Sequence, residues 1–119
     1  MTRCGRQMLG RRLIEMHPQP SAQGIEAYKK KIIAYSLGNF VFGTKNPDAH
    51  TGLILKITLS DDANLQTEIF PVLVDNTRTN YRTRPLQGNA MAEALKKLKK
   101  RSRAFKTRLR ILEDRAVYP

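Results

Sequence analysis

The stretch that decides the fold is residues 52–74, which read GLILKITLSDDANLQTEIFPVLV. In residues 52–60 the side chains alternate between two faces, with Leu53, Leu55, Ile57 and Leu59 on one and Ile54, Lys56 and Thr58 on the other. This period of two is typical of a strand with one buried and one half-exposed face. The polar residues 61–64 favour a turn, and residues 66–74 form a second strand-like run. The sequence therefore predicts an antiparallel hairpin, with Pro71 marking an edge strand or a bulge.

Residues 31–42, which read KIIAYSLGNFVF, predict another strand upstream of the hairpin. β-Branched and aromatic side chains fill this run without a helical period, and this favours a strand that is buried on both faces. Gly38 and Asn39 interrupt the run, and the pair supplies the backbone freedom for a bulge or a tight bend. Residues 1–23 are expected to be irregular and basic, because their prolines disfavour a helix. The weaker alternative is a short helix or strand around residues 10–16.

A long amphipathic helix is predicted near the C-terminus. Asn89 can cap its first turn, and Glu93 lies where an acidic side chain favours the helix dipole. The apolar residues that follow recur at spacings of three and four, with Ser102 filling a gap; they are Met91, Leu95, Leu98, Phe105, Leu109 and Leu112. The pattern predicts a helix of about 25 residues, whose part beyond Ser102 projects or frays.

The expected fold class is α+β, with about three mainly antiparallel strands and this helix. The chain divides into an irregular segment (residues 1–23), a β-rich core (residues 24–88) and a basic helix with its tail (residues 89–119).

The positive charge is concentrated in one segment. The net charge is +12, but residues 96–110 hold nine Lys and Arg residues and no acid, so the rest of the chain carries only +3. Such a helix can bind nucleic acid or lie on anionic lipid, or it can pack its apolar stripe on the sheet and leave its cations solvated. The last is the default for a helix that ends a globular domain. The candidate polyanion-binding residues are Lys96, Lys97, Lys99, Lys100, Arg101 and Arg103.

Composition excludes several other classes of protein. The chain is 40% hydrophobic and 27% charged, which argues against wholesale disorder. Cys4 is the only cysteine, so neither an intrachain disulfide nor a Cys-x-x-Cys metal ribbon is possible. No apolar run approaches the roughly 18 residues of a membrane span. The basic N-terminal residues are not followed by a long apolar stretch, and we therefore predict no signal peptide.

Three motifs follow one another along the chain: QGIEAY at residues 23–28, KIIAYSLGNFVF at residues 31–42 and GLILK at residues 52–56. Their order and spacing resemble the C-terminal section of the CapA family of bacterial capsule-synthesis proteins, and YSLGNF is the most specific piece. The later Pro71-Val72 and Arg84-Pro85 also look similar to the closing strand and the start of the last helix in that family. The resemblance covers about residues 10–98.

The resemblance implies a calcineurin-like metallophosphoesterase fold, in which helices flank two packed β-sheets, and a divalent metal site for Mn²⁺, Mg²⁺ or Zn²⁺. It also implies a role in making or anchoring poly-γ-glutamate capsule at the cell envelope. Most metal ligands of the family precede the matching residues, so we expect a fragment or divergent member that is not catalytic alone. Half a sandwich exposes apolar surface, which predicts self-association or pairing with a missing N-terminal half. The other expected partner is a polyanion, either poly-γ-glutamate or nucleic acid.

His17 is the candidate metal ligand that the resemblance leaves in this chain. The family has a Gly-His-His-Pro-His-like loop before its QGIE motif. A match without a gap aligns His17 with the variable first histidine and puts Pro18 and Pro20 at the ligand positions. A shift of one residue aligns His17-Pro18 with the His-Pro pair and puts Gln19 at the last histidine. Either match loses at least one ligand, and the alternative is a loop histidine without a partner.

Four further candidates lie within the matching motifs. Glu26 and Tyr28 either line the mouth of the site or end a loop against the core. Ser36 belongs to the YSLGNF run, as does Asn39, which either approaches the substrate or forms a bend that lets the strand cross between sheets. Outside these motifs, His50 is expected to be a solvated residue in the loop between two strands.

Overall fold

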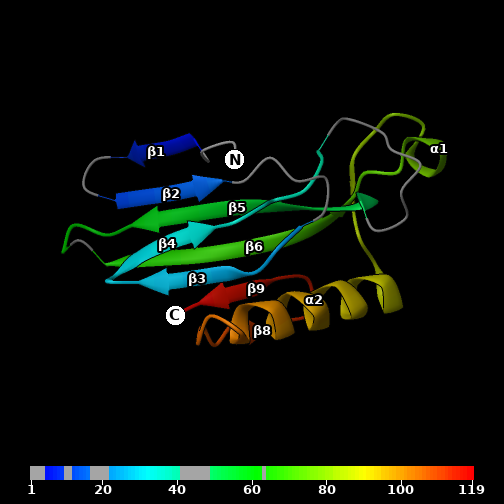
Figure 1. Ribbon diagram of the computed structural model, residues 1–119. Helices are drawn as coiled ribbons and strands as arrows, with labels where there is room; N and C mark the ends of the chain where they lie inside the picture. Colours follow the sequence, from blue (N-terminus) through cyan, green and yellow to red (C-terminus); the bar gives the residue numbers. More distant parts are fainter. Residues whose placement is uncertain (1–4, 10–11, 17–21, 41–48, 63) are drawn as a thin grey trace.

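The computed structural model describes residues 5–9, 12–16, 22–40, 49–62 and 64–119 (Figure 1). The elements in chain order are β1 (Gly5–Leu9), β2 (Arg12–Met16), β3 (Ile25–Tyr28), β4 (Lys31–Ala34), β5 (Thr51–Leu59), β6 (Leu65–Leu73), α1 (Asn76–Thr79), β7 (Arg84–Pro85), α2 (Gly88–Arg103), β8 (Arg110–Ile111) and β9 (Ala116–Tyr118). The strands form two hairpins, β1–β2 and β3–β4, and a five-stranded antiparallel sheet ordered β5-β6-β9-β8 with β7 also paired to β6. The predicted α+β class is confirmed.

The β5–β6 hairpin has the form that the sequence predicts. Its register is continuous over the nine residues of each strand. The N–H of Ser60 donates to the carbonyl oxygen of Asn64 at 3.0 Å and closes the polar turn. Leu53 is buried and Ile54 is 41% exposed, so the two faces of β5 differ as the alternation requires.

β6 is an interior strand rather than the edge strand that Pro71 suggested. β5 pairs with one of its sides, while β7 and β9 share the other. Along that second side the pairing with β9 ends at Ile69 and the pairing with β7 begins at Val72, so the proline lies in the gap. The N–H of Leu86 donates to the carbonyl oxygen of Pro71 there, at 3.3 Å. The prediction of an edge or a bulge is wrong, because the N–H that proline lacks falls between two neighbouring strands.

The strand predicted over residues 31–42 is shorter in the structure. Only β4 is formed, as half of a tight hairpin with β3, and its buried residues alternate with half-buried ones. The turn of this hairpin uses Lys29 and Lys30, whose φ angles are 48° and 60°. The expected backbone freedom is used at Gly38, where φ is 72°. Residues 41 and 42 of the predicted strand lie outside the described residues.

The predicted irregularity of residues 1–23 is wrong where the structure describes them. β1 and β2 form an antiparallel hairpin there, with Gly5 opposite Met16 and Leu9 opposite Arg12. Residues 17–21, which include the candidate ligand His17, lie outside the described residues.

Helix α2 is shorter than predicted. It has 16 residues, so the expected length of about 25 is wrong, and its N-cap is Gln87 rather than Asn89. Beyond the helix the exposure of side chains alternates, with Thr107 and Leu109 buried and Arg108 exposed. This period of two belongs to an extended chain. Leu109 continues the three-four spacing by coincidence, and the segment turns back into β8 and β9 instead of continuing the helix.

One face of the five-stranded sheet is covered by both α2 and the β3–β4 hairpin. The shared core consists of Ala22, Ile25, Ile32, Ala34, Leu53, Ile69, Leu86, Met91, Leu95, Leu98, Leu109 and Ala116. Figure 1 shows α2 running beside the strands, near β9 and β3. The predicted apolar stripe is confirmed from Met91 to Leu98, whereas Phe105 and Leu112 are 37% and 49% exposed. Among the described residues, no helix is both long and apolar enough to cross a membrane.

Candidate functional site

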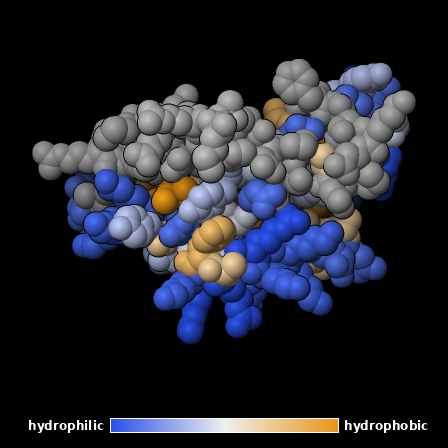
Figure 2. Space-filling model, in the orientation of Figure 1, coloured by the Kyte–Doolittle hydropathy of each residue, from blue (hydrophilic) through white to orange (hydrophobic). Residues whose placement is uncertain are grey.

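Helix α2 presents cations around the arc that its buried stripe leaves free. Because successive residues are about 100° apart around a helix, the buried Met91, Leu95 and Leu98 gather on one side. The predicted polyanion-binding residues occupy the remaining arc and are all exposed; we call Lys96, Lys97, Lys99, Lys100, Arg101 and Arg103 the basic face. Figure 2 shows hydrophilic side chains projecting from the edge of the molecule where α2 lies.

The cationic surface continues past the end of the helix. Lys106, Arg108 and Arg110 are exposed in the segment that follows α2. Arg103, Lys106 and Arg108 line a shallow hollow of about 360 Å³. The turn after α2 therefore keeps Lys106 and Arg108 near Arg103 of the basic face, although the helix does not extend to them.

The charges of the basic face are not paired with carboxylates in the described part of the chain. No ion pair within 4.0 Å joins one of these residues to an Asp or Glu side chain there. By contrast, Glu68 pairs with Arg115 at 2.7 Å and with Lys56 at 3.1 Å, away from the helix. Uncompensated like charges on one surface raise the local potential and attract an anion of matching length.

The end of α2 is fixed to the edge of β3 by two side-chain hydroxyls. Ser102 Oγ accepts the N–H of Ile25 at 2.9 Å, and Thr107 Oγ1 accepts the N–H of Ala27 at 2.9 Å. A Cβ added at Gly24 would lie 2.7 Å from backbone atoms of Arg101, so the chain before β3 contacts the helix backbone directly. The basic face is therefore presented on a rigid support.

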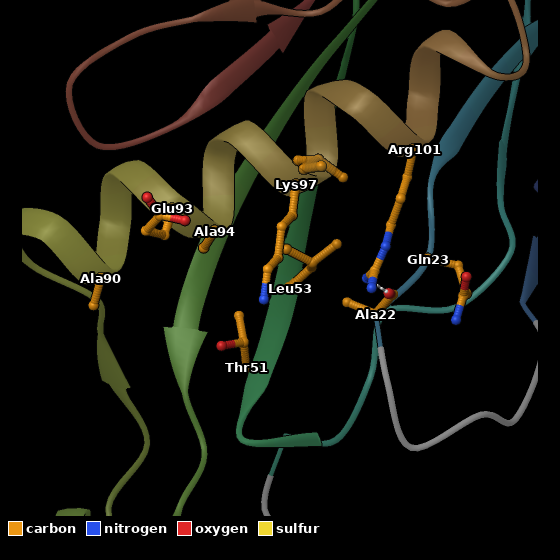
Figure 3. Close-up of a pocket in the computed structure, with 10 residues that line it drawn as sticks. Ala22, Gln23, Thr51, Leu53, Ala90, Glu93, Ala94, Lys97 and Arg101 are labelled. Carbon is orange, nitrogen blue, oxygen red and sulfur yellow. Dashed lines mark hydrogen bonds between the residues drawn. The ribbon is translucent and has the colours of Figure 1, made fainter. Parts of the chain in front are cut away.

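A cleft of about 150 Å³ lies between one flank of α2 and the start of β5 (Figure 3). The helix contributes Ala90, Glu93, Ala94, Lys97, Leu98 and Arg101, and the facing wall contributes Ala22, Gln23, Thr51 and Leu53. The guanidinium of Arg101 donates to the carbonyl oxygen of Ala22. Figure 3 shows the side chain of Lys97 reaching across toward Thr51.

The four candidates from the matching motifs do not converge on one site. Tyr28 lies at the turn of the β3–β4 hairpin, is 51% exposed and has the Lys29 ammonium 5.3 Å from its ring centre. Glu26, in the same hairpin, accepts a hydrogen bond from the hydroxyl of Tyr35. Ser36 follows β4 at the other end of the hairpin, and its Oγ accepts the N–H of Gly38 at 3.1 Å.

Asn39 lies beyond Ser36 and packs against the start of β5. A Cβ added at Gly52 would lie only 2.0 Å from the carbonyl oxygen of Asn39, so glycine is required for this close approach. The contact is made by the Asn39 backbone, so it fits the predicted bend and does not involve the side-chain amide. The functional roles of all four candidates stay predictions.

The structure also brings His50 next to Asp75, a contact that the sequence did not predict. His50 is half-buried rather than solvated, and its Nδ1 lies 3.6 Å from Asp75 Oδ2. Asp75 also caps α1 by accepting the N–H and hydroxyl of Thr77 at 3.1 and 2.7 Å. The Thr77 hydrogen bond holds the pKa of Asp75 below its usual value. The Asp-x-Thr pattern at the start of a helix could have identified Asp75 as a cap. Nothing in the local sequence indicates that Asp75 lies next to His50.

Metal-binding side chains do not cluster in the described part of the chain. Within that part, no group of three or more His, Cys, Asp and Glu side chains could hold an ion. His17 is not among the described residues, so its predicted role stays a prediction.

Comparison with known proteins adds no identification. A scan against models of protein families finds no matching family, and a search among curated proteins finds no match. The function is therefore inferred from the residues of this chain.

Proposed function

We propose that this chain binds an extended polyanion along helix α2. The observation that carries the proposal is the basic face, whose six cations are exposed on a fixed helix without carboxylate partners in the described part of the chain. An α-helix rises about 1.5 Å per residue, so cations at several positions along it can contact successive charges of an extended polymer. Binding would release the counterions of that polymer, so it should weaken as salt is added.

Poly-γ-glutamate is the polymer that we favour. The YSLGNF run and its flanking motifs resemble the CapA family, which connects the chain with that capsule polymer. Four of the six residues of the basic face are Lys, a compact point charge that offers no stacking surface for bases. Phe105, the aromatic residue nearest in sequence, stacks on Tyr35 with ring centres 4.7 Å apart. Nucleic acid is the second candidate, because its phosphates offer the same sign of charge.

The test compares two variants, each of which removes four positive charges from the chain. In the first, Lys96, Lys99, Lys100 and Arg103 are changed to Gln; in the matched control, the exposed Lys29, Lys30, Arg82 and Arg84 are changed to Gln. Fluorescence anisotropy with labelled poly-γ-glutamate at low salt should show weaker binding by about tenfold or more for the first variant. The control should lose much less, although both variants have the same net charge.

Equal losses in the two variants would contradict a localised surface and indicate attraction by net charge alone. Single- and double-stranded DNA of similar length form a second arm of the same measurement. Tighter binding of DNA than of poly-γ-glutamate at equal salt would favour the nucleic-acid alternative.

The metallophosphoesterase-like part of the resemblance leads to a separate proposal. The sandwich of that family would be formed only in part by these residues, and the metal implied would be Mn²⁺, Mg²⁺ or Zn²⁺. We expect the purified chain with any of these ions to hydrolyse phosphomonoesters and phosphodiesters no faster than the background rate. Metal-dependent turnover that a His17→Ala change abolishes would contradict this expectation.

A further inference from the structure

The cleft beside α2 differs from the outward-facing part of the basic face. Lys97 and Arg101 are four residues apart and line the cleft on the same flank of the helix. Lys99 lies about 200° from Lys97 around the helix axis and does not line the cleft. The helix therefore divides its cations between the flank that borders the cleft and the open surface.

Hydrogen-bonding capacity remains available on both cations of the cleft. Arg101 has five N–H donors, and the structure assigns one contact, to the carbonyl oxygen of Ala22. The Lys97 ammonium has three donors and forms no hydrogen bond or ion pair with another described residue. Figure 3 shows both side chains extending from the helix toward the facing wall, where the Thr51 hydroxyl adds a further polar group.

The walls of the cleft leave a small space between these groups. Ala90 and Ala94 occupy the helix flank where longer side chains would fill it, and Leu53 and Leu98 provide apolar surface. A volume of about 150 Å³ suits one small chemical group rather than a polymer chain.

We propose that this cleft is a discrete site for one oxyanion group, a carboxylate or a phosphate, held between Lys97 and Arg101. Charge-assisted hydrogen bonds from the ammonium and guanidinium would bind the oxygens, and the Thr51 hydroxyl would donate a further one. Glu93 also lines the cleft and lies four residues before Lys97, so its carboxylate competes with the ligand for the ammonium. The site binds with one-to-one stoichiometry, in contrast to the diffuse attraction of a polymer to the basic face.

Titrations of the full chain with inorganic phosphate and with acetate, followed by ¹H–¹⁵N NMR, test the site and distinguish the two ligand sources. We expect saturable shifts centred on Ala22, Thr51 and residues 94–101 with at least one of the anions. Lys97→Gln should weaken binding by about tenfold or more, since a charge-assisted bond is lost. Lys97→Arg should retain binding, and Glu93→Gln should tighten it.

Lys99→Gln is the matched control, because it removes the same charge from the same helix outside the cleft. The affinity of this variant for the small anion should stay within about twofold of that of the unmodified chain. The removed charge lies outside the cleft, and salt screens its electrostatic effect on the site. Shifts that rise linearly without saturation, or equal weakening by Lys99→Gln and Lys97→Gln, would overturn the site. Polymer binding without a saturable small-anion site would overturn this inference alone and leave the proposed function standing.

Discussion

Thr67 and Thr107 are both buried, but their hydroxyl groups differ in hydrogen bonding. Thr67 is fully buried in β6, and its Oγ1 has no hydrogen-bond partner among the described residues. Thr107 is also buried, but its Oγ1 accepts the N–H of Ala27 at 2.9 Å. An unpaired buried hydroxyl costs free energy, whereas an acceptor that satisfies a backbone N–H contributes to stability.

Replacing each threonine by valine should therefore change stability in opposite directions. Thr67→Val should raise the free energy of unfolding by about 1 kcal/mol, because it removes an unsatisfied hydroxyl and keeps the shape. Thr107→Val should lower it by about 1–3 kcal/mol, because the Ala27 N–H loses its acceptor. Urea denaturation measures both values. Destabilisation of similar size in the two variants would contradict this account of the hydroxyls.

Two carboxylates should make stability depend on acid pH. The Arg115 and Lys56 hydrogen bonds hold the pKa of Glu68 below its usual value, and the Thr77 hydrogen bond does the same for the pKa of Asp75. A lowered folded pKa adds stability that is complete above the unfolded pKa of about 4 and is lost as the pH falls through the folded pKa.

Urea denaturation at a series of pH values should therefore show a decreasing free energy of unfolding below about pH 4. A variant with Glu68→Gln and Asp75→Asn should be less stable near neutral pH and should lose less stability on acidification. A slope that is identical in the variant and the unmodified chain would assign the acid sensitivity to other groups.

Helix α2 shows which part of an element its sequence can predict. The stripe from Met91 to Leu98 was predictable, because apolar residues at spacings of three and four lie on the same side of a helix and therefore indicate its buried side. The end of the helix was not, because Leu109 fits a helical period and an extended one equally well. The actual end depends on Ser102 and Thr107 bonding to β3, a contact between residues far apart in sequence.

The two sides of α2 should differ sharply in their sensitivity to substitution. Leu95 is 2% exposed, so Leu95→Ala should cost about 2–5 kcal/mol of unfolding free energy by leaving a cavity. Lys100→Gln should change that free energy by less than about 0.5 kcal/mol, because the side chain is solvated. Thermal and urea denaturation check both values, and a cost for Lys100→Gln similar to that for Leu95→Ala would mean that the basic face is part of the packing.

Among the strands, the β5–β6 hairpin was predictable and the β3–β4 hairpin was not. β5 and β6 flank a polar turn that the sequence marks plainly, with alternating side chains in β5. The turn between β3 and β4 uses Lys29 and Lys30 at positive φ, where Asn and Gly are the residues that would signal it. The single strand predicted over residues 31–42 is therefore wrong: β4 is half of a hairpin, and a bend follows it.

At the scale of the whole molecule, the fold joins segments from both halves of the described chain. β9 completes the sheet beside β6, and α2 packs over the same face as β3 and β4. The sequence predicts the class and the basic helix, but these long-range pairings have no local signature. The cleft at α2 is also a product of packing, since Thr51 and Lys97 are brought together only by the fold. Self-association stays a prediction, which size-exclusion chromatography with light scattering can test.

The measurement that tests the central claim most directly is an NMR map of the surface that contacts poly-γ-glutamate. Titration of the ¹⁵N-labelled chain with the polymer at low salt should shift the amides of residues 96–103 and of the segment through Arg110. The outer face of β5, with Ile54 and Thr58, should change little, and about 0.5 M salt should reverse the shifts, since screening removes contacts between exposed charges. Shifts spread evenly over the molecule, or centred on β5 and absent from α2, would contradict the account.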